Sequence, residues 1–206
     1  MSLNRRDERR NLTLKLGDVA TVRSGLVLSR KQAKVFSDIV YKSINLKSIN
    51  AEGYIDKEHL DVYNASEILE PKYITHKGDI LIRLTSPYTA VLIEEDTTDL
   101  VVSSNFVIVR TNIEKILPEY LHWLLNTKEM RRRIFESSTS NMLSAVNAKF
   151  FTDLKLDTVP IDKQMKIAEM SRLARREIFL LNKLAEKKEI LYSESIKEFQ
   201  KKQRSN

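Results

Sequence analysis

The sequence predicts an α+β protein, in which a β-rich domain with short helices is followed by one long C-terminal helix. Between residues 12 and 111, short runs rich in Val, Ile, Thr and Tyr alternate with turn residues, a pattern typical of β-strands. After Pro160 about 40 residues follow without a proline or a glycine, which favours an uninterrupted helix. A hydrophobic content of 42% excludes a disordered or collagen-like chain.

The chain divides by composition into three segments. Residues 1–11 are polar with alternating charge and are expected to form a flexible N-terminal arm. Residues 12–160 are predicted to form the domain, and residues 161–206 the long helix. The whole chain has 206 residues, which is enough for a domain with a hydrophobic core and an appendage.

The second half of the predicted domain changes from strand to helix periodicity. Pro118 stands near a helix start and is followed by apolar residues three and four apart. A second helical stretch, residues 130–138, runs up to the polar tract SSTSN, which is expected to be a loop. A short helix and a strand are then expected before Pro160.

The predicted C-terminal helix carries two apolar rows side by side. Together they are wider than the surface that one neighbour would cover, so at least one other helix is expected to pack against them. The expected helix would be about 60 Å long, and the sequence offers no second helix of that length. We therefore predict pairing with another copy as a coiled coil, although the best heptad register places Glu177 and Lys188 on the seam. The alternative is a helix folded back on its own domain. The residues predicted to form the dimer helix are Ile167, Met170, Ala174, Ile178, Leu181, Leu184 and Leu191.

The net charge of +7 is unevenly distributed, with the surplus at both ends and around Arg131, Arg132 and Arg133. Such asymmetry favours a polyanionic partner such as nucleic acid, and the alternative is a solvated basic face. The sequence has no cysteine, no apolar run of about 18 residues and no hydrophobic signal segment at its start. We expect a cytoplasmic protein with neither disulfides nor a membrane span.

The residues of a catalytic centre are not recognisable in the sequence. The three histidines are scattered, and no glycine-rich phosphate-binding loop occurs. The acidic run Glu94–Asp96 with Asp99 is explained by a solvated turn better than by a nuclease's carboxylate set. We therefore predict a binding protein that has no cofactor and no metal, and that is not itself an enzyme.

Six segments in a fixed order resemble the DNA sequence-specificity (S) subunits of type I restriction-modification systems. They span most of the chain after Leu12: residues 16–25 (LGDVATVRSG), 41–60 (YKSINLKSINAEGYIDKEHL), 73–87 (YITHKGDILIRLTSP), 103–110 (SSNFVIVR), 118–127 (PEYLHWLLNT) and 138–170 (STSNMLSAVNAKFFTDLKLDTVPIDKQMKIAEM). None of the six segments is specific for this family by itself. Their occurrence together in this order is specific for it.

The resemblance implies a target recognition domain that reads one half of a split DNA site, followed by a spacer helix. That helix is the platform for the methyltransferase (modification) subunits, through which the endonuclease/translocase (restriction) subunit joins. Full S subunits carry two such domains and two antiparallel helices, and this chain has one of each. The expected resolution is a homodimer formed through residues 162–202, which would read a palindromic or nearly palindromic split site in double-stranded DNA.

Other functions remain open at this stage. One is an orphan or regulatory protein of the same fold, which interacts through its helix without binding specific DNA. Another, a stand-alone nuclease, would need a metal or carboxylate constellation that the sequence does not show.

The sequence departs from the family just before the long helix. The family has a Pro-apolar-Pro-apolar stretch before a glutamine, and only Pro160 stands before Gln164 here. Asp162 is predicted to cap the helix, so the helix start is expected to survive.

Three polar groups are predicted to contact DNA, because they concentrate the side chains that read base edges or bind phosphates. The first is Arg23, Ser24, Arg30, Lys31 and Lys34. The second lies at the end of the stretch HKGDILIRLTSP, residues 76–87, and consists of Arg83, Thr85, Ser86 and the following Tyr88. The third is Ser138, Thr139, Ser140, Asn141, Asn147 and Lys149, with a flexible loop as the alternative.

Two arginine assignments stay open. In the second group, strand alternation places Ile80, Ile82 and Leu84 on one face, and Leu81, Arg83 and Thr85 on the other. Arg83 has an alternative role as the partner of Glu94 or Glu95. The cluster Arg131–Arg133 suits phosphates, or else is a solvated helix face.

Overall fold

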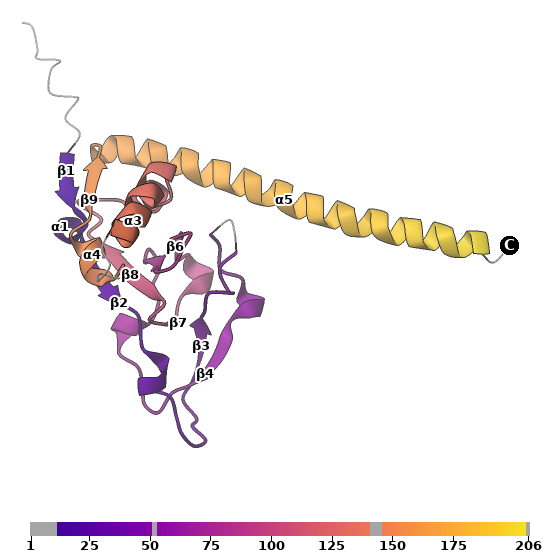
Figure 1. The fold of residues 1–206 in the computed structure, drawn as a ribbon, viewed down its shortest axis with the longest axis horizontal. Helices are drawn as coiled ribbons and strands as arrows, with labels where there is room; N and C mark the ends of the chain where they lie inside the picture. The colour runs from indigo at the N-terminus through magenta and orange to yellow at the C-terminus, as the bar shows by residue number, and fades with distance from the viewer. Residues whose placement is uncertain (1–11, 51–52, 141–145, 205–206) are drawn as a thin grey trace, which may run out of the picture. The chain divides into compact units, whose positions relative to one another are not determined.

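The computed structural model describes residues 12–50, 53–140 and 146–204, with Leu12, Thr139 and Ser140 described in their backbone only. The chain forms two units, Met1–Ala168 and Glu169–Asn206. The first is the domain unit, a mixed α+β structure, and the second is the greater part of one long helix (Figure 1). The predicted α+β class with a long C-terminal helix is confirmed.

The centre of the domain unit is an antiparallel sheet in the order β2 (Ala20–Ser24), β8 (Phe106–Thr111), β5 (Ile80–Arg83) and β6 (Ala90–Leu92). The strands β8, β5 and β6 are buried on both faces of the sheet for most of their length, whereas Thr21, Arg23 and Ser24 of β2 are exposed. Ile80 and Ile82 of β5 pack into one core, together with Leu84, while Leu81 packs into another. The predicted alternation of this strand is therefore confirmed, and it explains why the run ILI has no polar member.

Short helices cover one face of this sheet. They are α1 (Leu16–Val19), α2 (Pro118–Leu125), α3 (Lys128–Ser140) and α4 (Ala148–Thr152). Tyr120, Leu121, Ile134 and Phe151 are fully buried against Ile80 and Ile82 in the resulting core. The two-stranded sheet of β1 (Leu12–Lys15) and β9 (Lys155–Thr158) brings the start of the domain beside its end.

A second, smaller sheet covers the other face. Its order is β4 (Asp61–Asn64), β3 (Val40–Ile44) and β7 (Val101–Val102), and β3 pairs with β7 in parallel. Ile44 and Val102 pack against Leu81, Phe106 and Ile108 of the central sheet. Four short 3-10 turns lie in its connections: η1 (Leu28–Arg30), η2 (Lys57–His59), η3 (Pro71–Tyr73) and η4 (Glu95–Thr97).

The long helix α5 (Ile161–Arg204) begins inside the domain unit. Pro160 supplies the carbonyl that accepts hydrogen bonds from the backbone N–H groups of Lys163 and Gln164. Asp162 therefore lies in the first turn and does not cap the helix, contrary to the prediction, although an acidic side chain there still suits the positive end of the helix dipole.

Gln164 anchors the first turn of α5. Gln164 is 2% exposed. Its Oε1 accepts from the Leu117 N–H at 3.0 Å, and its Nε2 donates to the Val159 carbonyl at 2.8 Å. Ala168 is buried, and Ile167 packs partly against the domain core. Ile167 therefore contributes to its own domain core, and its role in a helix pair stays a prediction.

We expect Gln164→Ala to lower the free energy of unfolding by about 2 kcal/mol, because it leaves a backbone donor and a backbone acceptor unsatisfied. Thermal unfolding measures this loss. Gln200→Ala, on the exposed end of the same helix, is the matched control and should leave the midpoint unchanged. Equal midpoints for both variants would contradict the anchoring role of Gln164.

Beyond Ala168 most apolar residues of α5 are exposed, and Phe179 is partly exposed. Met170, Ile178, Leu181, Leu184 and Leu191 are 50% to 71% exposed. The next longest helix in the described residues, α3, has 13 residues against 44 for α5. None of the helices described is long and apolar enough to cross a membrane.

Candidate nucleic-acid interface

Three chain segments meet at one end of the central sheet, where β2 and β5 end and β8 begins. The Gly25 N–H donates to the Phe106 carbonyl at 3.0 Å, and the Leu84 N–H donates to the Asn105 carbonyl at 3.0 Å. Gly25 is required here because a Cβ atom would lie 2.2 Å from the Ser103 carbonyl oxygen. We call this end the Arg83 edge and define it by its polar side chains: Arg23, Ser24, Arg83, Thr85, Ser86, Ser104 and Asn105.

Arg23 and Arg83 lie on the same face of the sheet. Arg23 is paired with Ile108, and Arg83 is paired with Phe106 on the same strand. Because Phe106 and Ile108 are two residues apart, all four side chains share one face. Two strand spacings across and two residues along place the Cα atoms of the two arginines about 12 Å apart. Arg23 is exposed and Arg83 partly exposed.

The turn between β5 and β6 holds the second predicted group. The Arg83 N–H donates to the Thr89 carbonyl, the Tyr88 N–H donates to the Thr85 carbonyl, and the Ser86–Pro87 peptide bond is cis. The Arg83 Nε donates to the Thr85 Oγ1 at 2.8 Å. This contact orients the guanidinium through Nε. The two terminal nitrogens then form the fork that can bind the guanine O6/N7 edge or a phosphate. Thr85 and Ser86 are exposed.

The structure does not support the alternative role of Arg83 as a salt-bridge partner. Glu95 pairs with Lys77 at 2.8 Å. Within the described residues no carboxylate lies within ion-pair distance of Arg83, whose Nε is bound to a hydroxyl. The guanidinium charge is therefore available to a ligand.

Tyr88 differs from the rest of its predicted group, because its ring is buried in the helical core at 9% exposure. Its hydroxyl donates to the Ser138 Oγ at 3.0 Å. Tyr88 thus fixes the turn of the second group to the end of α3, where the third group begins. It positions the surface and is not itself exposed to DNA.

The third predicted group is helical where a loop was expected. Residues Ser137–Ser140 form the last turn of α3, since Ser137 Oγ and Ser138 Oγ bond to the carbonyls of Arg133 and Phe135 within the helix. The side chains of Thr139 and Ser140, and all of Asn141, lie outside what the structure describes.

Asn147 and Lys149 lie at the start of α4, which packs against β2. The Asn147 side chain accepts from the Phe150 N–H at 3.0 Å and so caps this helix, which is a structural task. Lys149 is exposed. Of this pair, Lys149 is the one whose side chain is available to a phosphate.

The structure splits the first predicted group. Arg23 and Ser24 belong to the Arg83 edge, whereas Arg30, Lys31 and Lys34 lie in the segment that packs along β4. There the Ala33 N–H donates to the Asn64 carbonyl, and Lys31 pairs with Glu67. That hydrogen bond raises the pKa of the Lys31 amine above its usual value, and the Glu67 carboxylate offsets the positive charge of the lysine.

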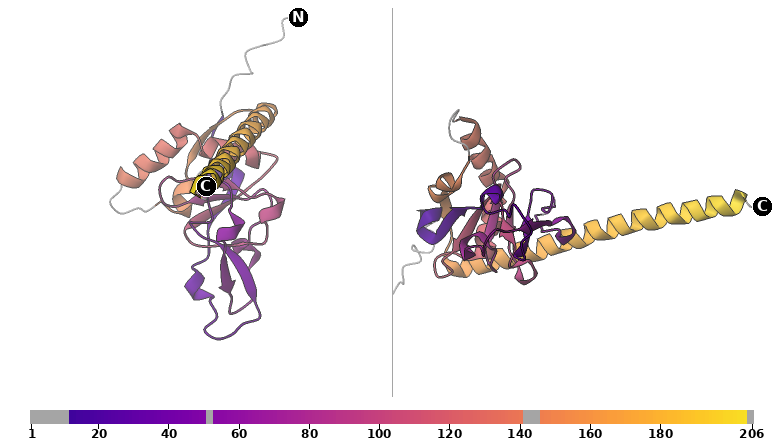
Figure 2. Two further views of the ribbon diagram at one scale, coloured as in Figure 1. Left: turned by 90° about the vertical axis from the view of Figure 1, so that its right-hand side faces the viewer. Right: turned by 90° about the horizontal axis from the view of Figure 1, so that it is seen from below.

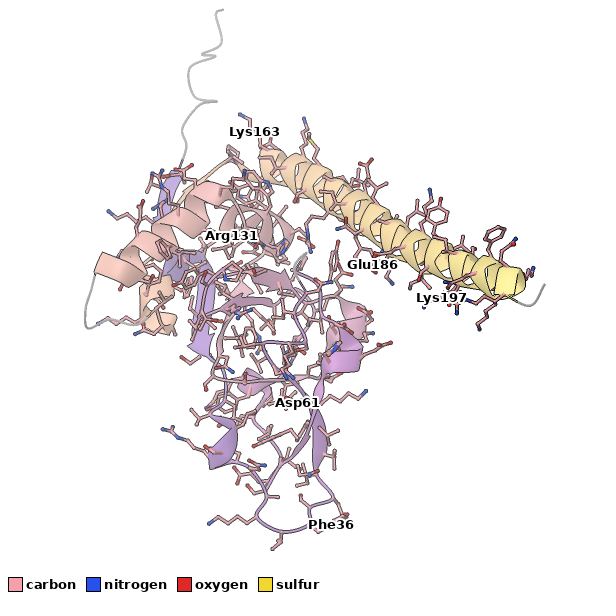
Figure 3. All side chains as sticks on the ribbon, turned by 45° about the vertical axis from the view of Figure 1, so that its right-hand side comes forward. Phe36, Asp61, Arg131, Lys163, Glu186 and Lys197 are labelled. Carbon is pink, nitrogen blue, oxygen red and sulfur yellow. The ribbon has the colours of Figure 1, made fainter. Side chains whose placement is uncertain are left out.

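Arg30 and Lys34 remain exposed. Phe36, two residues after Lys34 in the sequence, lies at the opposite end of the domain unit from Arg131 (Figure 3). Figure 2 shows the same arrangement, with the violet segments around β3 and β4 at one end and α3 at the other. These two cations can bind phosphates without sharing the Arg83 edge.

Arg131, Arg132 and Arg133 do not form one basic surface. Arg131 Nη2 donates to the Asn126 Oδ1 at 2.6 Å, and burial lowers the pKa of its guanidinium below the usual value. Arg133 Nη2 donates to the Lys155 carbonyl at 3.0 Å and so links α3 to β9. Only Arg132 is exposed, and it pairs with Glu136. Neither the phosphate-cluster interpretation nor the solvated-face interpretation describes these arginines.

Ser104 and Asn105 were not predicted, although they are exposed at the centre of the Arg83 edge. They occupy the middle of a turn that is closed by the Phe106 N–H donating to the Ser103 carbonyl at 3.1 Å. An Asn amide is the side chain that pairs with the adenine N6/N7 edge. The sequence Ser-Ser-Asn between two apolar runs is a turn signal that points to this position.

The comparisons with known proteins agree with this architecture, in which an α+β domain is followed by one long helix. The chain belongs to the family of the type I restriction modification DNA specificity domain, whose model matches residues 11–192. No curated protein matches the sequence. Among the described residues, no three His, Asp or Glu side chains gather so that they could hold a metal ion.

Solved structures share the fold at low sequence identity. The HsdS subunit from Thermoanaerobacter tengcongensis matches with a TM-score of 0.62 at 15% identity, over 84% of this chain and 44% of that chain. A chain from a study of complex assembly and conformational transition of the type I R-M system gives 0.63 at 17%, over 85% and 45%. The S subunit from M. genitalium gives 0.53 at 15%, over 84% and 41%. This chain thus spans less than half of each.

Proposed function

We propose that this chain is a non-catalytic DNA-recognition subunit of a type I restriction-modification system and that its domain reads one half of a split duplex site. The Arg83 edge carries the proposal. It places two arginines on one face about 12 Å apart, which is the width of a DNA major groove. Hydroxyls and the Asn105 amide lie beside them, so the edge combines guanine-type, adenine-type and phosphate-type contacts.

The same proposal assigns the partners. Modification subunits of the methyltransferase would bind along the helical part of the chain, and the restriction subunit would join through them. Two copies would pair through α5, because its apolar rows beyond Ala168 are exposed and the described residues hold no second helix of comparable length. Two identical domains related by a two-fold axis would read an inverted repeat.

A selection from randomised duplex DNA tests the function. The purified chain, alone and with a partner methyltransferase, is expected to enrich two inverted copies of a short motif at a fixed separation. Enrichment of no motif under either condition would overturn the proposal and favour a regulatory protein that interacts only through its helix. Measuring at two salt concentrations separates specific contacts from phosphate binding.

Light scattering tests the pairing. We expect the full chain to have twice the mass of one 24.0 kDa chain and Leu181→Lys/Leu184→Lys to be monomeric, because both apolar side chains lie on the seam. Glu186→Lys, on the same exposed helix, changes the net charge equally and should leave the dimer intact. A monomeric unaltered chain would contradict the pairing.

A further inference from the structure

The loop before β3 presents two apolar side chains to solvent at the end of the domain unit opposite Arg131 (Figure 3). Val35 is 81% exposed and Phe36 is 89% exposed, more than any other large apolar side chain that the structure describes. We call these two residues the apolar tip. Exposing a phenyl ring to water costs free energy, which a ligand that covers the ring would recover.

The base of this loop is fixed to the end of β4 on both sides. On one side the Ala33 N–H donates to the Asn64 carbonyl at 3.0 Å. On the other side the Ala65 N–H donates to the Ile39 carbonyl at 2.8 Å, and the Ser37 hydroxyl donates to the Ala65 carbonyl at 2.6 Å. The apolar tip therefore projects from a braced base, so inserting it into a ligand costs less conformational entropy than ordering a free loop.

The surface around the apolar tip is basic. Residues 30–42 include four cations and one carboxylate. Lys31 pairs with Glu67. The other three cations are exposed and, within the part of the chain that the structure describes, lie beyond ion-pair distance of any carboxylate: Arg30, Lys34 and Lys42.

This combination fits duplex DNA better than a partner protein. Cations bind the phosphates, and an apolar side chain between them can enter the stack of bases. A stable protein interface takes about 800 Å² from each partner, whereas one Phe side chain offers only about 150 to 250 Å².

We infer that the apolar tip inserts between two base pairs from the minor groove and kinks the duplex, beyond the bases that the Arg83 edge contacts. This inference rests on the proposed function and adds a second contact to it. The chain from Ser24 to Val35 spans at most about 40 Å, and the turn η1 within it shortens that reach. One turn of duplex DNA is about 34 Å long, so both surfaces can contact the same half of the site.

The insertion supplies specificity without a hydrogen bond to a base. Separating a stacked base step costs free energy of the same order as the burial of a phenyl ring returns. Insertion is therefore favourable at the steps that unstack most easily, which are the pyrimidine–purine steps TA and CA/TG. We expect one such step at a fixed distance from each recognised motif, among base pairs that the Arg83 edge does not reach.

A base-stacking probe tests the insertion. The duplex enriched in the selection carries 2-aminopurine in place of each adenine in turn, because the fluorescence of this base rises when it is unstacked. The unaltered chain should raise the fluorescence at one step in each half of the site. Phe36→Ala should abolish that rise and weaken binding about 10-fold. Phe36→Leu keeps an apolar wedge and should keep the rise.

Ile113→Ala is the control, because Ile113 is 66% exposed and follows the opposite end of β8. It should change neither affinity nor fluorescence. Phe36→Ala should unfold at the same temperature as the unaltered chain, since the ring is exposed.

Three results would overturn the insertion. No rise with the unaltered chain, or the same rise with Phe36→Ala, would do so while leaving DNA recognition intact. Weaker binding of the methyltransferase by Phe36→Ala, with unchanged DNA binding, would assign the apolar tip to a protein contact. A selection that enriches no motif would remove the proposed function and the insertion together.

Discussion

Asp79→Ala is expected to lower the free energy of unfolding of the domain by about 3 kcal/mol. The Asp79 carboxylate is 3% exposed and accepts from Arg110 Nε at 2.8 Å, from Arg110 Nη2 at 3.1 Å and from the His76 N–H at 2.9 Å. Arg110 also donates to the carbonyls of Pro71 and Ile74. Removing the carboxylate leaves a partly buried guanidinium without its counter-charge where β5 begins.

Thermal unfolding measures this effect, with an expected fall in the midpoint of about 6 to 12 °C for a domain of this size. Asp96→Ala is the control, because the Asp96 carboxylate is exposed and pairs with Lys57 at 2.8 Å on the surface. That exposed pair should contribute less than about 1 kcal/mol. Similar losses for both variants would show that the Asp79 cluster does not hold the strand in place.

Arg83→Ala is expected to weaken binding to the selected DNA site by about 10- to 100-fold, because one guanidinium that pairs with a base edge is lost. Arg23→Ala on the same face should have a similar effect. Because the one side-chain hydrogen bond of Arg83 in the described residues goes to the Thr85 hydroxyl, the unfolding midpoint should change little. Fluorescence anisotropy on specific and scrambled duplexes measures the change in discrimination.

Two further variants separate base reading from charge. Arg83→Lys keeps the charge but loses the two-pronged geometry, so it should retain the salt dependence of binding while losing specificity. Arg132→Ala removes an exposed arginine that pairs with Glu136, and it should leave discrimination unchanged. Equal loss of discrimination in Arg132→Ala and Arg83→Ala would show that the edge contributes only general positive charge.

Local patterns predicted much of the fold. The alternation of Ile80, Leu81 and Ile82 is reproduced by two separate cores, and α2 begins at Pro118 as expected. The small sheet was not predicted in its pairing, because β3 joins β7 in parallel across more than 50 residues of sequence. Such long-range pairing leaves no local signal.

The candidate site was predicted in part. The residue types of the strand end at Arg83 pointed to a surface for DNA, and this remains the proposal. The burial of individual side chains could not be predicted from the residue types. Tyr88 and Arg131 have polar ends, yet both point into the domain, where Tyr88 donates a hydrogen bond to Ser138 and Arg131 donates one to Asn126. Asn105 was missed because only the pairing of β8 with β5 brings its turn beside Arg83.

Photo-cross-linking from the Arg83 edge tests the central claim most directly. A cross-linker attached through Ser86→Cys should label bases inside both halves of the selected site. The same probe at Glu114→Cys, an exposed position beyond the opposite end of β8, should label none. Base labelling from Glu114→Cys, with none from Ser86→Cys, would contradict the assignment of the Arg83 edge as the DNA-reading surface.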